Sequence, residues 1–361
     1  MRLKPWVLGI VIITFISLSA CQGGTLARSL SVEDALGRTV SFPTPPQKII
    51  IAGRANFMLN DAVYLFPDAP ERVLALTRST QAANAFVNLL DPEAEAKTRF
   101  MSDAAAEEIA AAQPDLVLLK SYMKDPLGDT LEQLGIPVVY LEFETPEQYE
   151  RDLATLGKLF GDANHAEKLW GYYQEILERA ADATEGLTDA QRPRVLLLQY
   201  TEKGGEVAFK VPPASWIQTQ MVTLAGGIPV WTEAAQGGGW ATVNLEQIAA
   251  WDADQIYIIN YFGSAVEVVK QLQTDTQWSV LRAVRDGYLI PFASDLHSWD
   301  QPDTRWGLGL LWLGQQIQPE RFAGIDLEDE VYGFFGDFYG LDRATIDSEI
   351  MALLNASQLQ P

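Results

Sequence analysis

The chain has 361 residues, of which 48% are hydrophobic and 20% charged, the composition of a folded protein with a large apolar core. Its 26 basic and 48 acidic residues give a formal net charge of −22, which excludes nucleic acid as a partner because that role needs a basic surface. Only two histidines are present, His165 and His297, too few for a zinc or manganese site built from several imidazoles.

The N-terminus has the pattern of an export signal. Arg2 and Lys4 precede an apolar stretch, residues 6–18, that is shorter than the roughly 18–20 residues a helix needs to span a bilayer. Small residues and then the only cysteine, Cys21, follow in a run that resembles the lipobox of bacterial lipoproteins. This predicts a signal peptide over residues 1–20 and a lipid anchor on Cys21. A plain secretory signal and an uncleaved anchor are the alternatives, and all three place the protein outside the cytoplasm, in the periplasm or on the outer face of the cell membrane.

After a tether over residues 21–31, a Gly37-Arg38 turn signal predicts a hairpin. Strand and helix patterns then alternate through a predicted N-terminal lobe, residues 32–160. Continuous runs of Val, Ile and Leu between helices favour parallel strands that are buried on both faces. These runs predict strands at residues 49–52, 73–76, 116–119 and 137–141, and an amphipathic pattern predicts a helix at residues 56–66.

Residues 146–184 carry no strand pattern, and Gly161-Asp162 divides them into two predicted helices. The second, residues 162–184, would be about 33 Å long at about 1.5 Å per residue, enough to link two lobes. The alternation then resumes in a predicted C-terminal lobe, residues 192–320, and a helical extension, residues 326–361, closes the chain. The predicted strands of this lobe are 195–198, 256–259 and 289–291, its predicted helices are 216–225, 245–251 and 304–317, and the extension begins with a helix at 327–339.

The two halves share a repeat. Residues 107–119 match residues 246–258, with the same spacing from Glu107 to Asp115 and from Glu246 to Asp254. Each copy is a short helix that leads into a buried strand. Such a pattern recurs in α/β proteins, but the copies occupy comparable places on either side of the long helix, which favours an internal duplication.

The order and spacing of several short motifs resemble the substrate-binding proteins of ATP-binding-cassette (ABC) importers that take up ferric siderophores, haem and cobalamin. The segment 298–303 also resembles members that bind molybdate or tungstate. The motifs lie at residues 34–40, 113–117, 134–139, 244–248 and 278–288. The resemblance implies an α/β fold of two Rossmann-like, doubly wound lobes with mostly parallel sheets, joined by one long linking helix.

The same resemblance implies a receptor that is not an enzyme, acts as a monomer and has no cofactor or metal of its own, although its cargo carries iron or molybdenum. A ferric siderophore is the first expectation, a molybdate-type oxyanion the second, and haem or cobalamin follow. In the family, one glutamate on each lobe docks against arginines of the permease, and the matching positions are Glu107 and Glu246.

In doubly wound sheets ligands bind beyond the carboxyl ends of the strands, so the loops after the predicted strands supply the candidate ligand-binding residues. Arginine or lysine beside aromatic rings suits a planar or chelated anion. For Arg54 the alternatives are a loop cap or a surface pair with Asp61, and for Trp299 the alternative is a role in pinning its loop to the core. The candidates are Arg54, Arg78, Lys120, Tyr122, Lys210, Trp240, Tyr261, His297 and Trp299.

Two other classes of function fit the sequence less well. A secreted hydrolase would be expected to show a Gly-x-Ser-x-Gly elbow, a His-Glu-x-x-His pair or a free thiol, and the sequence has none of these. A structural surface lipoprotein would be expected to show repeats or extended β patterning, and the sequence has neither beyond the single match between its two halves.

Overall fold

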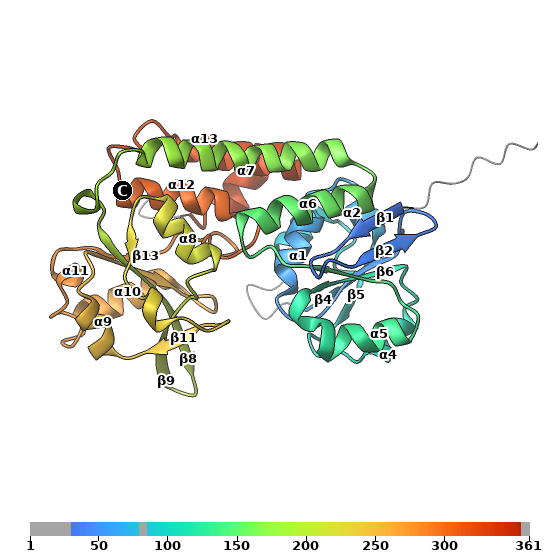
Figure 1. The fold of residues 1–361 in the computed structure, drawn as a ribbon, viewed down its shortest axis with the longest axis horizontal. Coiled ribbons are helices and arrows are strands. Elements are labelled where there is room, and N and C mark those ends of the chain that lie inside the picture. The colour runs from blue at the N-terminus through green and yellow to red at the C-terminus, as the bar shows by residue number, and fades with distance from the viewer. Residues whose placement is uncertain (1–29, 79–84, 355–361) are drawn as a thin grey trace, which may run out of the picture.

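The computed structural model describes residues 30–78 and 85–354, which form two α/β lobes joined by helix α7 (Ala163–Thr184) (Figure 1). The predicted signal peptide, Cys21 and all but the last two residues of the predicted tether lie outside the described residues. Within the described ranges, no helix combines the length and the apolarity that a membrane crossing requires.

The N-terminal lobe contains a five-stranded parallel sheet in the order β5-β4-β3-β6-β7. Its strands are β3 (Ile49–Ile51), β4 (Val73–Thr77), β5 (Thr98–Phe100), β6 (Leu116–Lys120) and β7 (Val138–Leu141). All four predicted strands are confirmed, and β5 is additional. The helices are α1 (Asn56–Val63), α2 (Ala69–Arg72), α3 (Ala85–Leu90), α4 (Ala106–Ala111) and α5 (Asp129–Gln133), with short 3-10 and π turns at Ser121–Met123 and Lys124–Gly128. The predicted hairpin is β1 (Leu30–Glu33) and β2 (Thr39–Phe42), and Gly37 has a φ of 70° in its turn.

The C-terminal lobe is built on a mixed sheet in the order β11-β9-β8-β12-β13, with β10 beside β8. The sheets are mostly parallel, as predicted, but this one is mixed on one side, because β9 runs antiparallel to both β8 and β11. Gly204 and Gly205, both at positive φ, form the tight turn between β8 and β9. The strands are β8 (Arg194–Lys203), β9 (Glu206–Val211), β10 (Ile228–Pro229), β11 (Ala241–Val243), β12 (Gln255–Ile259) and β13 (Leu289–Pro291), and the helices are α8 (Ile217–Leu224), α9 (Leu245–Trp251), α10 (Ala265–Thr274), α11 (Arg282–Arg285) and α12 (Trp306–Ile317).

Helix α7 runs along one side of the molecule, above both sheets in the view of Figure 1. The preceding helix, α6 (Pro146–Phe160), ends at Gly161, whose φ of 76° an L-residue adopts only with strain. Asp162 then caps α7, because its side chain accepts a hydrogen bond from the His165 N–H at 3.0 Å. The predicted break at Gly161-Asp162 is therefore confirmed.

The C-terminal extension is a second connection between the lobes. Helix α13 (Leu327–Tyr339) lies along α7, where Glu330 pairs with Arg179 at 2.7 Å. Its last residue reaches the N-terminal lobe, where the Tyr339 hydroxyl donates to the main-chain oxygen of Asp61 at 2.9 Å. A short helix, α14 (Arg343–Thr345), and a π turn at Ile346–Met351 follow.

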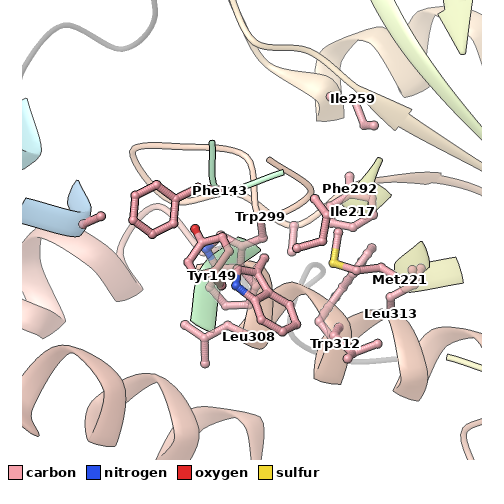
Figure 2. Packing of buried hydrophobic residues seen from close by; sticks show 14 of the residues in the cluster. Phe143, Tyr149, Ile217, Met221, Ile259, Phe292, Trp299, Leu308, Trp312 and Leu313 are labelled. Carbon is pink, nitrogen blue, oxygen red and sulfur yellow. The ribbon is translucent and has the colours of Figure 1, made fainter. Parts of the chain in front are cut away.

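One hydrophobic cluster runs continuously through both lobes, from Ile49 in β3 to Leu196 in β8 and Trp312 in α12. Figure 2 shows its central part, to which Tyr149 of α6, Trp299 and Leu308 of α12 belong. Because the core is not divided between the lobes, a large movement of one lobe against the other would expose apolar surface, at about 25 cal/mol per Å².

Arg305 adds a buried ionic connection between the lobes. Its guanidinium pairs with Asp61 of α1 at 2.7 Å and with Asp295 at 2.9 Å, and it stacks 4.1 Å from the ring centre of Phe86. Arg305 and the two carboxylates are almost completely shielded from solvent. Removing one partner of such a buried pair leaves an uncompensated charge and typically costs about 3–5 kcal/mol.

Candidate ligand-binding cavity between the lobes

A cavity of about 490 Å³, called here the interlobe cavity, lies between the two lobes. Its volume is within the roughly 300–1,000 Å³ of pockets for small organic ligands and cofactors. The residues that line it are Ala55, Phe57, Met58, Tyr122, Glu142, Glu144, Gln199, Trp216, Gln218, Gly238, Trp240, Tyr261, Phe262, Gln301 and Pro302.

Most of these residues follow the carboxyl ends of strands, as expected for a doubly wound sheet. On the N-terminal side, α1 begins after β3, Tyr122 follows β6, and Glu142 follows β7. On the C-terminal side, Tyr261 follows β12 and Gln301 lies beyond β13. The two lobes thus contribute loops from corresponding strands.

An aromatic wall covers much of the cavity. Trp240 lies edge to face with Trp216 and with Tyr261, at ring-centre distances of 5.8 and 6.0 Å. The Tyr261 hydroxyl donates to Asp300 at 2.6 Å, which fixes the orientation of this ring. Phe262 and Tyr122 are 65% and 51% exposed and therefore present open ring faces at the cavity. Planar groups or cations can bind to such faces.

An acidic loop forms another part of the lining. Glu142 and Glu144 follow β7, and the Glu144 main-chain oxygen accepts a hydrogen bond from the N–H of Ile217 in the other lobe at 3.1 Å. The Lys120 ammonium pairs with Glu144 at 2.6 Å and also contacts the Glu142 main-chain oxygen and, at 3.8 Å, the Met58 sulfur. Its three N–H groups are thereby occupied. Among the described residues Glu142 has no ion-pair partner, and no arginine or lysine side chain lines this cavity.

The side-chain oxygen of Gln218 in α8 is a hydrogen-bond acceptor that no donor of the described structure reaches. The residue is 2% exposed and lines the cavity, and its Oε1 makes no hydrogen bond within the described structure. A buried polar atom left without a partner costs about 1–3 kcal/mol. A donor on a bound ligand would remove that cost.

A second cavity of about 360 Å³ shares Tyr261, Phe262 and Gln301 with the interlobe cavity and is also lined by His297. The His297 ring stacks on Phe57 at 4.9 Å, and its Nδ1 has no hydrogen-bond partner among the described residues. Burial, with a smaller contribution from Arg305, holds the pKa of His297 well below its usual value. The imidazole is therefore neutral near pH 7.

The structure brings three of the predicted ligand-binding residues to the interlobe cavity, namely Tyr122, Trp240 and Tyr261. His297 lines only the second cavity. Arg54, Arg78 and Lys210 line neither of the two: Arg54 and Arg78 are exposed, and Lys210 is half-buried on β9. Arg54 also does not pair with Asp61, because Arg305 occupies that carboxylate.

Two predicted ligand contacts are corrected by their burial. Lys120 is completely buried and ion-paired, so its charge compensates Glu144 instead of facing a ligand. Trp299 is also completely buried; its Nε1 donates to Asp295 at 3.2 Å, and it packs in the core shown in Figure 2. The alternative considered for Trp299, that it pins its loop to the core, agrees with this placement.

Several lining residues were not predicted as ligand contacts. Glu142 and Glu144 follow a predicted strand. The rule that ligands bind beyond strand ends applies to acidic residues as well as to basic ones, so it points to these two glutamates. Trp216 and Gln218 lie at the start of a predicted helix, and only the tertiary structure shows that this helix end faces the other lobe.

The predicted docking residues Glu107 and Glu246 are both exposed, each in the first turn of its helix, α4 and α9. Figure 1 shows these two helices in different lobes, on the side of the molecule away from α7. The structure thus places one free carboxylate of this pair on each lobe.

Comparisons with known proteins agree with the two-lobed architecture. The family model described as "Periplasmic binding protein" matches residues 80–296. A curated relative, the molybdate-binding protein MolA of Haemophilus influenzae, is 24% identical over 349 residues, which cover 89% of this chain and 94% of MolA.

Solved structures show the same fold. A periplasmic solute-binding protein of Veillonella parvula has a TM-score of 0.71 and 23% identity, covering 91% of this chain and 99% of its own. MolA of H. influenzae with bound molybdate has a TM-score of 0.71 and 20% identity, covering 86% and 98%. CeuE of Helicobacter pylori, described as a Ni-His complex, has a TM-score of 0.70 and 16% identity, covering 90% and 99%.

Proposed function

The chain belongs to the periplasmic binding protein family, and we propose that the substrate it binds for an ABC importer is a metal chelate such as a ferric siderophore. The proteins of this family and the relatives above are binding proteins of transporters, not enzymes. Membership of the family implies a place outside the cytoplasm.

The volume of the interlobe cavity carries this proposal. A tetrahedral oxyanion occupies the space of only a few water molecules, each about 30 Å³, whereas the cavity measures about 490 Å³. An organic chelate fills a much larger fraction of that space and gains contact with the aromatic wall. The continuous core and the α7 and α13 connections favour small closure, so the affinity comes from a largely preformed site.

Titration of the purified protein with metal complexes tests the proposal, with the fluorescence of Trp216 and Trp240 as the readout. The panel contains a ferric trihydroxamate, a ferric tricatecholate, haem, cobalamin, a nickel–histidine complex and molybdate. We expect submicromolar binding of at least one chelate, and Trp240→Ala should weaken it about tenfold or more because the ring supplies stacking area. If no chelate binds, the proposal is wrong.

Molybdate is a second candidate, because the curated relative MolA is a molybdate-binding protein. Two features of this chain count against it. First, two carboxylates line the interlobe cavity, and no arginine or lysine among the described residues does. Second, Asp300 and Asp303, in the segment that resembles molybdate-binding proteins, are completely buried. Binding of molybdate in the same panel, with no binding of any chelate, would favour this candidate.

The proposal also includes the oligomeric state, the membrane anchor and the docking residues that the sequence predicts. The receptor is a monomer that is held at the membrane through lipidated Cys21, and Glu107 and Glu246 dock it on the permease. A mature N-terminus that carries acyl chains on Cys21, detected by mass spectrometry, would support the anchor. Export of a Cys21→Ser variant in soluble form is the expected result, whereas unchanged membrane attachment would contradict it.

A further inference from the structure

We infer that the ligand of the interlobe cavity carries a positively charged nitrogen donor, such as a pendant ammonium or guanidinium group, which binds beside Glu142. This inference rests on the proposed function and specifies the class of chelate. It starts from the lining, in which two carboxylates face six aromatic side chains and no arginine or lysine is present among the described residues.

The charges of the lining do not cancel. Lys120 is the nearest cation to the acidic loop, and its ammonium is used by Glu144, the Glu142 main-chain oxygen and the Met58 sulfur. Glu142 is left without an ion pair among the described residues, and Arg151, whose charge also acts on Glu142, forms its ion pair with Asp152 at 2.7 Å. An anionic ligand would therefore meet a carboxylate without an ion-pair partner at short range, where solvent screening is weak.

The hydrogen-bonding groups point to the same class of ligand. Oε1 of Gln218 is an acceptor, is almost completely shielded from solvent and has no donor within the described structure. The Tyr261 hydroxyl already donates to Asp300, so its proton is not available to a ligand. A ligand with N–H groups would supply donors both to Gln218 and to Glu142.

The aromatic side chains favour a cation as well. Tyr122, Phe262 and Trp240 line the same cavity as Glu142. Ring faces attract ammonium and guanidinium groups, and more strongly where water is excluded. Carboxylates combined with open ring faces form a site for organic cations, in contrast to the arginine–aromatic site for a chelated anion that the sequence predicted.

Three ferric complexes test the inference by calorimetric titration. They share one iron-binding framework, and their pendant groups are positively charged, neutral and negatively charged. They are the complexes of desferrioxamine B, which has a pendant ammonium, of its neutral N-acetyl derivative and of its anionic N-succinyl derivative. We expect the ammonium complex to bind at least about tenfold more tightly than the N-acetyl complex, and the N-succinyl complex to bind most weakly.

The variants locate the preference. Glu142→Gln should reduce the ratio between the ammonium and N-acetyl complexes to about one, because it removes the unpaired carboxylate and keeps the side-chain size. Glu150→Gln, an equal charge change on an exposed part of α6 outside the cavity, should leave the ratio unchanged. Glu144 is unsuitable for this test, since its loss would leave Lys120 buried without a counter-ion.

Four results overturn the inference. Two concern affinity: the N-acetyl complex binds as tightly as the ammonium complex or more tightly, or the N-succinyl complex binds more tightly than the ammonium complex. The other two are a preference for the ammonium complex that survives Glu142→Gln, and no binding of the ammonium complex at millimolar concentration. Failure of the proposed function is distinguishable from these. If a neutral or anionic chelate binds, only the charge preference is wrong, whereas the absence of binding by every chelate removes the metal-chelate function as well.

Discussion

Asp300 is a carboxyl group behind the aromatic wall whose protonation depends on burial. Its two oxygens accept hydrogen bonds from Ser298 and Tyr261. Complete burial raises its pKa from the ordinary 3.8 to about 7, and the two hydroxyl donors only partly offset this. Between these values the folded protein holds a proton that the unfolded chain has released.

This shift has a defined effect on stability. Because the folded state binds more protons in this range, the contribution of Asp300 to the free energy of unfolding is largest below pH 4 and is lost as the pH rises to about 7. Asp300→Asn cannot titrate, so the difference in unfolding free energy between wild type and variant should change by roughly 2–4 kcal/mol across this range. Urea denaturation at several pH values measures it. Parallel pH profiles for the two proteins would contradict the assigned shift.

Asp115 and Asp254 show the duplication in side-chain detail. The Asp115 carboxylate accepts hydrogen bonds from the N–H groups of Gln47 and Lys48 just before β3, and that of Asp254 accepts from Arg194 at the start of β8. Two residues before each aspartate the backbone has a positive φ, 54° at Gln113 and 41° at Asp252. The sequence match predicted equivalent helices and strands. The structure adds that, in each half, the equivalent aspartate accepts hydrogen bonds from the start of the neighbouring strand.

Helix α12 depends on a glycine for its contact with the Trp299 loop. A methyl group on Gly309 would clash with the carbonyl oxygen of Trp299 and lie 3.0 Å from its carbonyl carbon. Gly309→Ala should therefore destabilise the fold by about 1–3 kcal/mol, because main-chain atoms cannot move aside as a flexible side chain can. Thermal and urea unfolding measure this change.

Gly333 of α13 is the matched control for this prediction. A methyl group there meets no atom within 4 Å, and its backbone is helical. Gly333→Ala should stabilise the protein by about 0.5–1 kcal/mol, because alanine loses less conformational entropy in a helix. Equal effects of the two substitutions would show that helix propensity, not the contact with Trp299, decides the result.

The elements that the sequence predicts best are those with a strong local pattern. The central strands β6 and β12 are continuous apolar runs, and α9 and α13 have the predicted bounds. Strand β9 was missed because it lies near the edge of its sheet, where Val207 is 49% exposed, so its side chains do not form a buried run. Its pairing with β11 joins residues that are distant in sequence.

The candidate site was predicted less completely than the fold, for a physical reason. Most of the loops that line it follow from the rule for strand ends, which selected Tyr122 and Tyr261, whereas Trp240 was predicted as an aromatic wall beside a run of glycines. The charge of the site depends on which ions are paired. Lys120 looks like a free cation in the sequence, but its burial against Glu144 becomes visible only when the two loops are folded together.

The Arg305–Asp61 pair joins the lobes and should govern how far they separate. Asp61→Asn removes one buried partner and leaves the guanidinium with fewer counter-charges, so the unfolding free energy should fall by about 3–5 kcal/mol. Solution X-ray scattering of the folded variant without ligand should show a larger radius of gyration than wild type. The half-buried Arg179–Glu330 pair between α7 and α13 provides the control, since water still reaches both side chains and Glu330→Gln should cost at most about 1 kcal/mol. Similar losses in both variants would contradict a special role of the buried pair.

Two carboxylates at a fixed separation can orient the whole receptor on its importer. Glu107 and Glu246 are exposed on α4 and α9 of different lobes, and the continuous core and the α7 and α13 connections limit changes in their distance. Replacing both by glutamine should lower ligand-dependent uptake in reconstituted vesicles about tenfold or more, because two charge-assisted contacts are lost, while the affinity for the ligand stays unchanged. Glu108→Gln, one residue along on the same exposed turn, should transport normally. If the double variant transports like wild type, docking must use another surface; if its ligand affinity falls, the two glutamates act on the cavity instead.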